Sequence, residues 1–393
     1  MSALDQPHIF FLFLNMKSFS FLIALLYFPF YTIGQQTITG SITHDNLHRD
    51  YILYVPASYV PGTPAPLVLN FHGYGSNALE QMFYGDFRPI ADTAGFLVVH
   101  PLGTVDLLGN THWNVGWGNS TVDDVGFTSA LIDSLSATYD IDQDRIYSTG
   151  MSNGGFFSYL LACELSDRIA AIASVTGTMN INQPPACHPE HPMPVMEIHG
   201  TADPTVAYDG TIFFASIPSV LNFWVNFNAC TATPVITPIP DINTDDGCTA
   251  ENQLYANGTN GAEVEHYKII NGVHAWPGSA FGGVGTNQDI NASKEIWRFF
   301  SQYNIHGLIQ TTSTKEEGNA NPVLLYPNPA SSEITVELES GSPAHYTLST
   351  LLGQPVMSGT INNHTLILNL DELPEGIYVL SVKDQVFEIV KKL

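Results

Sequence analysis

The stretch that decides the fold is Arg145–Ser158, which reads R-I-Y-S-T-G-M-S-N-G-G-F-F-S. A β-branched and aromatic run ends at Gly150, and an apolar, helix-compatible segment begins after Gly155. Ser152 lies between them in the pattern G-x-S-x-G, which is typical of a nucleophilic serine on a tight strand-to-helix turn. Side chains at positions 150 and 154 would collide with neighbouring backbone there, and the helix would direct free N–H groups at an oxyanion. An ordinary glycine-rich turn is the alternative interpretation.

Strand and helix patterns alternate on both sides of this stretch. The predicted strands are 50–55, 67–71, 96–100, 145–149, 169–175, 195–199 and 264–270, and the predicted helices are 78–94, 124–139, 153–164, a segment within 211–227, and 289–303. Such alternation predicts an α/β fold with a mostly parallel sheet and helices on both faces. Chemistry in such sheets lies at the carboxyl ends of the strands.

Three polar residues each follow a predicted strand. They are Ser152, Asp203 in G-T-A-D-P and His274 in N-G-V-H-A-W. Their order along the chain is that of α/β-hydrolases. In such a triad the histidine takes the serine proton, and the aspartate fixes the imidazole tautomer and stabilises its charge. We therefore predict that these three residues are catalytic. Taken singly, Asp203 is also interpretable as a turn cap and His274 as a surface histidine.

The oxyanion donors are predicted from two loops. The strand 67–71 ends in H-G-Y-G, and the loop after that strand supplies one N–H in this architecture. The residue after the nucleophile supplies the other. The candidates are the backbone N–H groups of Tyr74 and Asn153, with Gly75 as second choice for the first.

Five separate motifs follow one another along the chain: V-D-D-V-G-F (122–127), G-M-S-N-G-G (150–155), L-A-C-E-L-S-D-R-I-A-A-I-A (161–173), I-H-G-T-A-D (198–203) and H-A-W-P-G (274–278). In this order they resemble the motifs of exported esterases of the polyhydroxybutyrate depolymerase/feruloyl esterase group. The resemblance covers roughly residues 36–307. It implies an α/β-hydrolase fold, the triad Ser152–Asp203–His274, cleavage of carboxylic esters, and neither a metal nor an organic cofactor. One departure is Val273, where the group usually has glycine.

The substrate is left open between feruloyl–sugar esters, acetylated xylan and polyester chains. Trp113 and Trp117 lie in H-W-N-V-G-W-G, and Trp276 follows the predicted catalytic histidine. Aromatic rings at the active edge stack on sugar or cinnamoyl rings, so these three are candidate substrate contacts, with core packing as the alternative. A serine peptidase and a non-catalytic surface binding protein are the rival functions.

The charge bears on the partners. The chain has 37 acidic and 12 basic residues and a net charge of −25. Such a surface repels phosphate backbones, so we predict that nucleic acid is not a partner.

The N-terminus reads as a secretory signal. Lys17 is followed by an apolar run, 19–33, and then Gly34 before a polar start. We predict a signal peptide over 1–34, with Met16 as the possible true start. The rival interpretation is an uncleaved anchor.

Four cysteines in an exported chain are expected to form disulfides. Cys230 and Cys248 flank a loop rich in Pro, Thr and Asp, so a local bridge between them is the simplest pairing. Cys163 and Cys187 then either pair with each other or stay free. Zinc binding at Cys187 and its neighbours, His188, Glu190 and His191, is a further alternative.

The composition changes after residue 306. Residues 307–322 read as a linker that follows a catalytic domain over 35–306. In 323–393, alternating runs at 333–338, 346–349, 365–370, 377–382 and 386–390 predict a small all-β sandwich. Its Y-P-N-P (326–329), G-I-Y (376–378) and terminal V-K-K-L resemble the C-terminal sorting domain of type IX secretion. The resemblance implies the secretion machinery as a partner and release or surface attachment after passage through the periplasm. A sugar-binding module is the alternative.

Overall fold

The computed structural model describes residues 35–118, 120–309, 323–338, 343–350, 355–382 and 385–391. Contacts divide the chain into two compact units, with the boundary between Ile309 and Gln310. The predicted signal peptide and most of the predicted linker lie outside the described residues. Gly307–Leu308, expected in the linker, instead forms strand β14 of the first unit. Within the described part of the chain, no helix is both long and apolar enough to cross a membrane.

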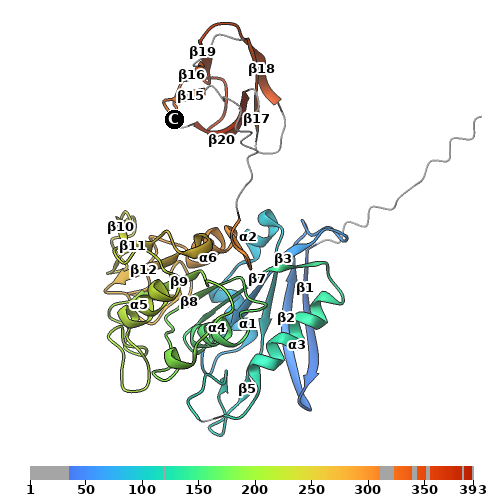
Figure 1. The fold of residues 1–393 in the computed structure, drawn as a ribbon, viewed down its shortest axis with the longest axis vertical. Helices are drawn as coiled ribbons and strands as arrows, with labels where there is room; N and C mark the ends of the chain where they lie inside the picture. Colours follow the sequence, from blue (N-terminus) through green and yellow to red (C-terminus); the bar gives the residue numbers. More distant parts are fainter. Residues whose placement is uncertain are drawn as a thin grey trace, which may run out of the picture. The chain divides into compact units, whose positions relative to one another are not determined.

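The first unit is built on one large mixed sheet (Figure 1). Its strand order is β1 (Gln36–His44), β2 (Leu47–Val55), β4 (Leu97–Pro101), β3 (Ala65–Phe71), β7 (Ile141–Met151), β8 (Ala171–Val175), β9 (Val195–Gly200), β12 (Val264–Ile270), β11 (Thr249–Tyr255) and β10 (Val235–Pro238). The central strands, from β4 to β12 in this order, run parallel. The outer strands are antiparallel to their neighbours. The predicted mostly parallel α/β sheet is confirmed, with antiparallel strands added at both edges.

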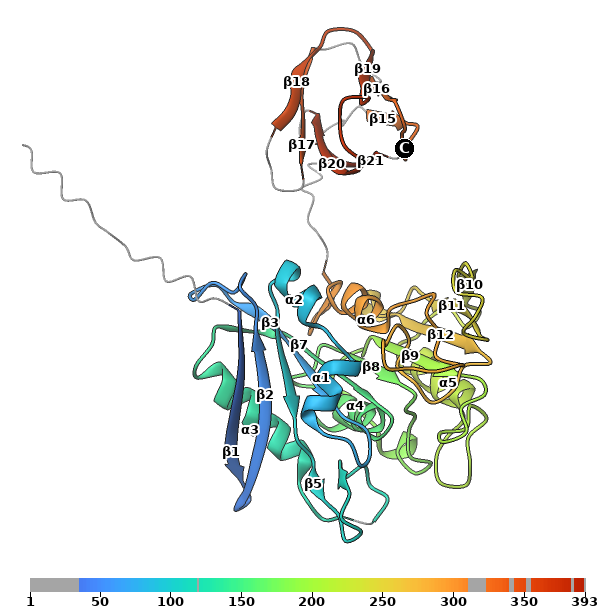
Figure 2. The same ribbon diagram turned by 180° about the vertical axis from the view of Figure 1, so that it is seen from behind.

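Helices cover both faces of this sheet. Those with described bounds are α1 (Ala78–Tyr84), α2 (Arg88–Ala94), α3 (Asp124–Ser136), α4 (Asn153–Glu164), α5 (Ile217–Phe227) and α6 (Ala292–Phe300), with short 3₁₀ turns at Pro184–Ala186 and Thr259–Gly261. Apolar residues of α3, α4 and α5 form one core with the sheet, and those of α2 and α6 form the other. Figure 2 shows the molecule from behind. Small two-stranded pairs join β5 (Thr104–Val105) with β6 (Thr111–His112), and β13 (Tyr303–Asn304) with β14.

The single helix expected over 78–94 is wrong. The chain forms α1 and α2 with a break at Gly85, which caps α1. Pro89 lies in the first turn of α2. Proline at this position cannot donate to the carbonyl of residue 85, and its ring clashes with that carbonyl in a continuous helix. The chain therefore starts a new helix instead of extending the first.

The second unit contains two antiparallel sheets around a separate apolar core. One sheet has the order β15 (Val323–Tyr326), β16 (Glu333–Leu338), β19 (Thr365–Asn369), and the other β18 (Pro355–Ile361), β17 (Ala344–Thr350), β20 (Gly376–Val382), β21 (Gln385–Lys391). Ile334, Val336, Leu348 and Leu380 are among its buried residues. The predicted all-β character of this region is confirmed. Strands β15 and β18 were not predicted.

Candidate active site

The turn between β7 and α4 places Ser152 at the carboxyl edge of the sheet. Ser152 has φ 54° and ψ −119°, backbone angles that residues other than glycine rarely adopt. A Cβ at position 150 would lie 2.6 Å from the carbonyl oxygen of Phe71, and a Cβ at position 154 would overlap the same oxygen. Only glycine fits at these two positions, because the end of β3 lies directly against the turn.

Asp203 and His274 meet at the ends of β9 and β12. The Oδ2 atom of Asp203 lies 2.7 Å from Nδ1 of His274. Because a carboxylate only accepts, Nδ1 of His274 donates and its Nε2 is left to accept a proton. The other carboxylate oxygen accepts from the backbone N–H groups of Thr205 (2.8 Å) and Val206 (2.9 Å). Both oxygens of Asp203 are thus held in place.

These hydrogen bonds also tune the carboxylate. Burial alone would raise the pKa of Asp203, but the bonds from His274, Val206 and Thr205 outweigh burial and lower it. A carboxylate that stays ionised is suited to stabilise a positive charge on His274.

A fully buried group of polar side chains, His199, Glu197 and Tyr159, lies next to Asp203. Nε2 of His199 lies 2.8 Å from the carbonyl oxygen of Val206 and 3.5 Å from Oδ2 of Asp203. Its Nδ1 lies 3.0 Å from Glu197, which also accepts from the hydroxyl of Tyr159 (2.7 Å). Burial would lower the pKa of His199, but Glu197 outweighs burial and raises it. Burial raises the pKa of Glu197 itself.

Ser152 and His274 line one cavity of about 460 Å³. Its wall is mostly apolar and comes from the loop after β3, the end of β7 and the segment after His274. Its lining residues are Gly73, Tyr74, Ser76, Tyr84, Met151, Ser152, Val273, His274, Ala275, Trp276, Ser279, Phe281, Gly282, Gly283, Val284 and Thr286. The sequence prediction missed most of this wall. The glycine-rich run directly after His274 was the signal that could have indicated the loop.

Val273, which departs from the family pattern, fits here because the residue opposite it, Gly285, has no side chain. Its N–H donates to the carbonyl of Gly285 (3.0 Å). A Cβ at position 285 would lie 2.6 Å from a methyl carbon of Val273. The glycine at 285 therefore makes room for the valine beside the predicted catalytic histidine.

The loop after β3 lies directly beside Ser152. A Cβ at position 73 would be 3.4 Å from the Cβ of Ser152. The N–H of Gly75 donates to the carbonyl of Thr111 (2.8 Å), so it is not free for a substrate and the second-choice donor is excluded. Across the described residues, the N–H of Tyr74 has no hydrogen-bond partner. Asn153 begins α4, where the first N–H groups have no acceptor inside the helix.

The three candidate tryptophans occupy different places. Trp276 lines the cavity, and its indole N–H donates to Ser293 (3.2 Å). Trp117 is 40% exposed, lies edge-to-face on Phe156 and is not among the residues that line the cavity. The prediction of Trp113 as a substrate contact is wrong, because its ring is fully buried between β3 and α4.

The expected bridge between Cys230 and Cys248 is also wrong. The disulfide joins Cys163 to Cys187, and the other two thiols are free. The N–H of Thr231, next to Cys230, donates to the carbonyl of Ala256 (2.8 Å), just past the end of β11, whereas Cys248 directly precedes the start of that strand. A strand of that length holds the two cysteines roughly 20 Å apart. Because Cys187 is bridged, its thiolate is not available as a zinc ligand.

Comparison with known proteins assigns the family. Residues 49–231 match the model described as "Esterase PHB depolymerase". A protein of Aspergillus oryzae named "Probable feruloyl esterase C" is 30% identical over 206 residues, which are 52% of this chain and 71% of that protein. The chain belongs to the PHB depolymerase esterase family. The resemblance stated from the sequence motifs is confirmed.

Two further relatives are longer proteins. Feruloyl esterase B of Piromyces equi is 29% identical over 239 residues, covering 58% of this chain and 42% of that protein. A bifunctional acetylxylan esterase/xylanase of Neocallimastix patriciarum is 28% identical over 289 residues, covering 73% of this chain and 38% of that protein. This chain thus spans less than half the length of either relative.

The remaining comparisons concern the fold and the C-terminal unit. The solved acetyl xylan esterase from Aspergillus awamori has a TM-score of 0.50 at 13% identity, over 67% of this chain and 99% of that one. This likeness supports the α/β-hydrolase fold of the first unit. Residues 324–393 match the model "Secretion system C-terminal sorting domain", which points to secretion or a cell-surface location.

Proposed function

We propose that this member of the esterase family is an exported serine hydrolase that cleaves carboxylic esters through an acyl-enzyme. One observation carries the proposal: Asp203 and His274 are hydrogen-bonded at 2.7 Å, and His274 lines the same cavity as Ser152. The strained serine turn and the accepting Nε2 of His274 agree with this assignment.

In the acylation step, Oγ of Ser152 attacks the ester carbonyl carbon while Nε2 of His274 takes the serine proton. The carbonyl oxygen becomes an oxyanion, which the N–H groups of Tyr74 and Asn153 would bind. When the carbon–oxygen bond breaks, the imidazolium returns its proton to the departing alcohol. Asp203 stabilises the imidazolium throughout.

In the second step, water repeats the same chemistry. His274 removes a proton from the water, the hydroxide attacks the acyl carbon, and the same N–H groups bind the second oxyanion. Collapse of this intermediate releases the carboxylic acid and returns the proton to Oγ of Ser152.

The substrates that we propose are feruloyl or acetyl esters of plant polysaccharide, or polyhydroxyalkanoate polyester. The names of the relatives support the first two, and the family description supports the third. The cavity has a mostly apolar wall and a volume of about 460 Å³, so it accommodates an acyl group much larger than acetyl. Exposed Phe281 and Val284 extend the apolar surface at the cavity wall. Rates on methyl ferulate, acetylated xylan and polyhydroxybutyrate, measured side by side, rank the three classes.

The test of the mechanism is Ser152→Ala. With p-nitrophenyl acetate we expect kcat to fall roughly 10⁴- to 10⁶-fold, because the triad acts as a unit. A fluorophosphonate probe should label the wild type at Ser152 and leave the variant unlabelled. Ser58→Ala, at an exposed serine after β2, is the control and should match the wild type in both assays. An unchanged rate in Ser152→Ala would refute the proposal.

A further inference from the structure

We propose that Trp113, which is fully buried and does not line the cavity, is the positioning residue that holds together the two backbone segments carrying the oxyanion donors. The proposal rests on the proposed esterase mechanism and assigns a role to a residue outside the cavity. Trp113 lies on the short segment after β6, between the loop that follows β3 and the start of α4.

The indole of Trp113 fixes the first of these segments. Its N–H donates to the carbonyl oxygen of His72 at 3.0 Å, two residues before Tyr74. The ring packs edge-to-face on Phe71 (5.0 Å between centroids) and stacks on Phe157 of α4 (5.2 Å). The side chain therefore spans from the end of β3 to the helix behind Ser152.

The backbone of Trp113 fixes the second segment. Its N–H donates to Oδ1 of Asn153 (2.7 Å), and its carbonyl accepts from Nδ2 of Asn153 (3.1 Å). The amide side chain of Asn153 thus pairs with the backbone of Trp113 in the way a neighbouring strand would. Because the side chain is held at both ends, the backbone N–H of Asn153 has a fixed direction.

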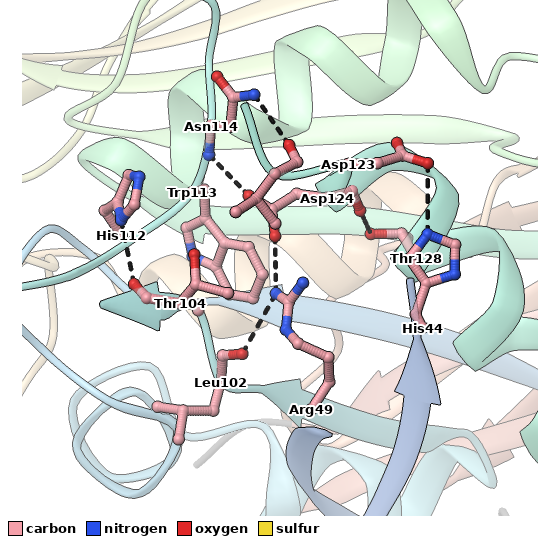
Figure 3. Close-up of polar contacts among 12 residues, drawn as sticks. His44, Arg49, Leu102, Thr104, His112, Trp113, Asn114, Asp123, Asp124 and Thr128 are labelled. Carbon is pink, nitrogen blue, oxygen red and sulfur yellow. Dashed lines mark hydrogen bonds and ion pairs between the residues drawn. The ribbon is translucent and has the colours of Figure 1, made fainter. Parts of the chain in front are cut away.

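The buried ion pair between Arg49 and Asp124 holds the backbone at Asn114, the residue after Trp113 (Figure 3). Oδ2 of Asp124 accepts from the backbone N–H of Asn114 (2.8 Å), and Oδ1 of Asp124 accepts from Arg49 (2.6 Å). Both charged side chains are almost fully buried, and the guanidinium lies 3.8 Å from the ring centroid of Phe127. The charge of Asp124 is therefore neutralised where it holds Asn114, next to Trp113.

If these contacts fix the oxyanion donors, breaking them should affect catalysis. Misplacing an oxyanion donor weakens binding of the developing charge more than binding of the neutral ester. Loosening Trp113 should therefore lower kcat with little change in KM. If the contacts of Trp113 only supported the core, loosening them would lower the stability of the fold but would not lower kcat selectively over KM.

The first test is Trp113→Phe, which keeps an aromatic ring and removes the indole N–H. With p-nitrophenyl acetate we expect kcat to fall about 10- to 100-fold and KM to change by less than about 3-fold. Affinity for a trifluoromethyl ketone, which mimics the tetrahedral intermediate, should fall in parallel with kcat. The matched control is Trp224→Phe, because Trp224 is also fully buried but its indole N–H has no partner among the described residues. The control should keep kcat within about twofold of the wild type.

The second test is Asn153→Ala, which removes both side-chain contacts to Trp113 and keeps the backbone N–H. It should give the same loss in kcat, and it decides the matter if Trp113→Phe does not fold. If Ser152 is required for activity and the folded variants keep wild-type kcat and inhibitor affinity, the positioning role is wrong although the proposed function stands. The same holds if Trp224→Phe loses as much kcat as Trp113→Phe. If wild-type activity does not depend on Ser152, the proposed function fails, and the inference with it.

Discussion

Buried histidines are the residues that we expect to make stability depend on pH. Burial lowers the pKa of His72 to about 4 and that of His100 and His266 to about 3. In the unfolded chain these groups titrate near pH 6.5. Between those values the unfolded chain binds more protons than the folded one, so acid favours unfolding. The lowered pKa of Asp203 acts in the same direction at lower pH, and the raised pKa of His199 acts in the opposite one.

His100 gives the sharpest test, because neither of its ring nitrogens has a partner among the described residues. In His100→Phe, the free energy of unfolding should fall less steeply with acid than in the wild type. The difference in slope approaches about 1.4 kcal/mol per pH unit between roughly pH 6 and 4. Urea unfolding at several pH values measures it. His48→Gln, on the exposed surface of β2, is the control and should follow the wild type. Parallel curves for His100→Phe and the wild type would contradict the assignment.

At the scale of the element, the sequence predicts best where local and tertiary signals agree. Helix α4, which is largely apolar, and strand β12, which Asn271-Gly272 follows directly, have the predicted bounds. The edge strand β10 and its neighbour β11 were missed: β10 is exposed along its whole length, and β11 is largely polar. Strand β1 was missed too, although Asp45 and Asn46, both at positive φ, form the hairpin turn that follows it.

The same contrast explains what could be predicted of the site. The residues that follow parallel strands are brought to one edge by topology alone, so Ser152, Asp203 and His274 could be selected without coordinates. The cysteine pairing and the cavity wall depend on distances between segments that are far apart in the sequence, and no local pattern encodes those distances. The role of Trp113 was also out of reach, because a buried and an exposed tryptophan look alike in a sequence.

The disulfide ties the loop after β8 to the last turn of α4, the helix that begins next to Ser152. Replacing both Cys163 and Cys187 by serine should lower the free energy of unfolding by about 3 kcal/mol, because the unfolded chain loses a constraint across 24 residues. Urea unfolding under non-reducing conditions measures this. The control, Cys230→Ser, removes a thiol that forms no bridge and should cost less than about 1 kcal/mol. Equal stability of the double variant and the wild type would show that the bridge contributes nothing.

At the scale of the whole molecule, the proposed catalytic residues and the sorting domain lie in different units. Ser152, Asp203 and His274 all lie before Ile309, whereas the described core of the C-terminal unit runs from Val323 to Ile389. Each unit therefore has its own buried apolar surface.

Deleting 323–393 tests this division. The shortened protein should keep kcat/KM on p-nitrophenyl acetate within about twofold, since no residue of the proposed mechanism is removed. In a host with type IX secretion it should accumulate in the periplasm, whereas the full chain is exported. Normal export with weaker polysaccharide binding would instead assign the unit as a sugar-binding module. Loss of activity in the purified shortened protein would mean that the units depend on each other.

Because the C-terminal unit has its own apolar core, we expect it to act as a sorting domain that can be transferred to other proteins. Fused behind an unrelated passenger, it should still fold, since the buried residues of its described core run from Val323 to Ile389. A cell with type IX secretion could then export other proteins, provided that each carries an N-terminal signal peptide and has this unit joined to its C-terminus in front of Val323.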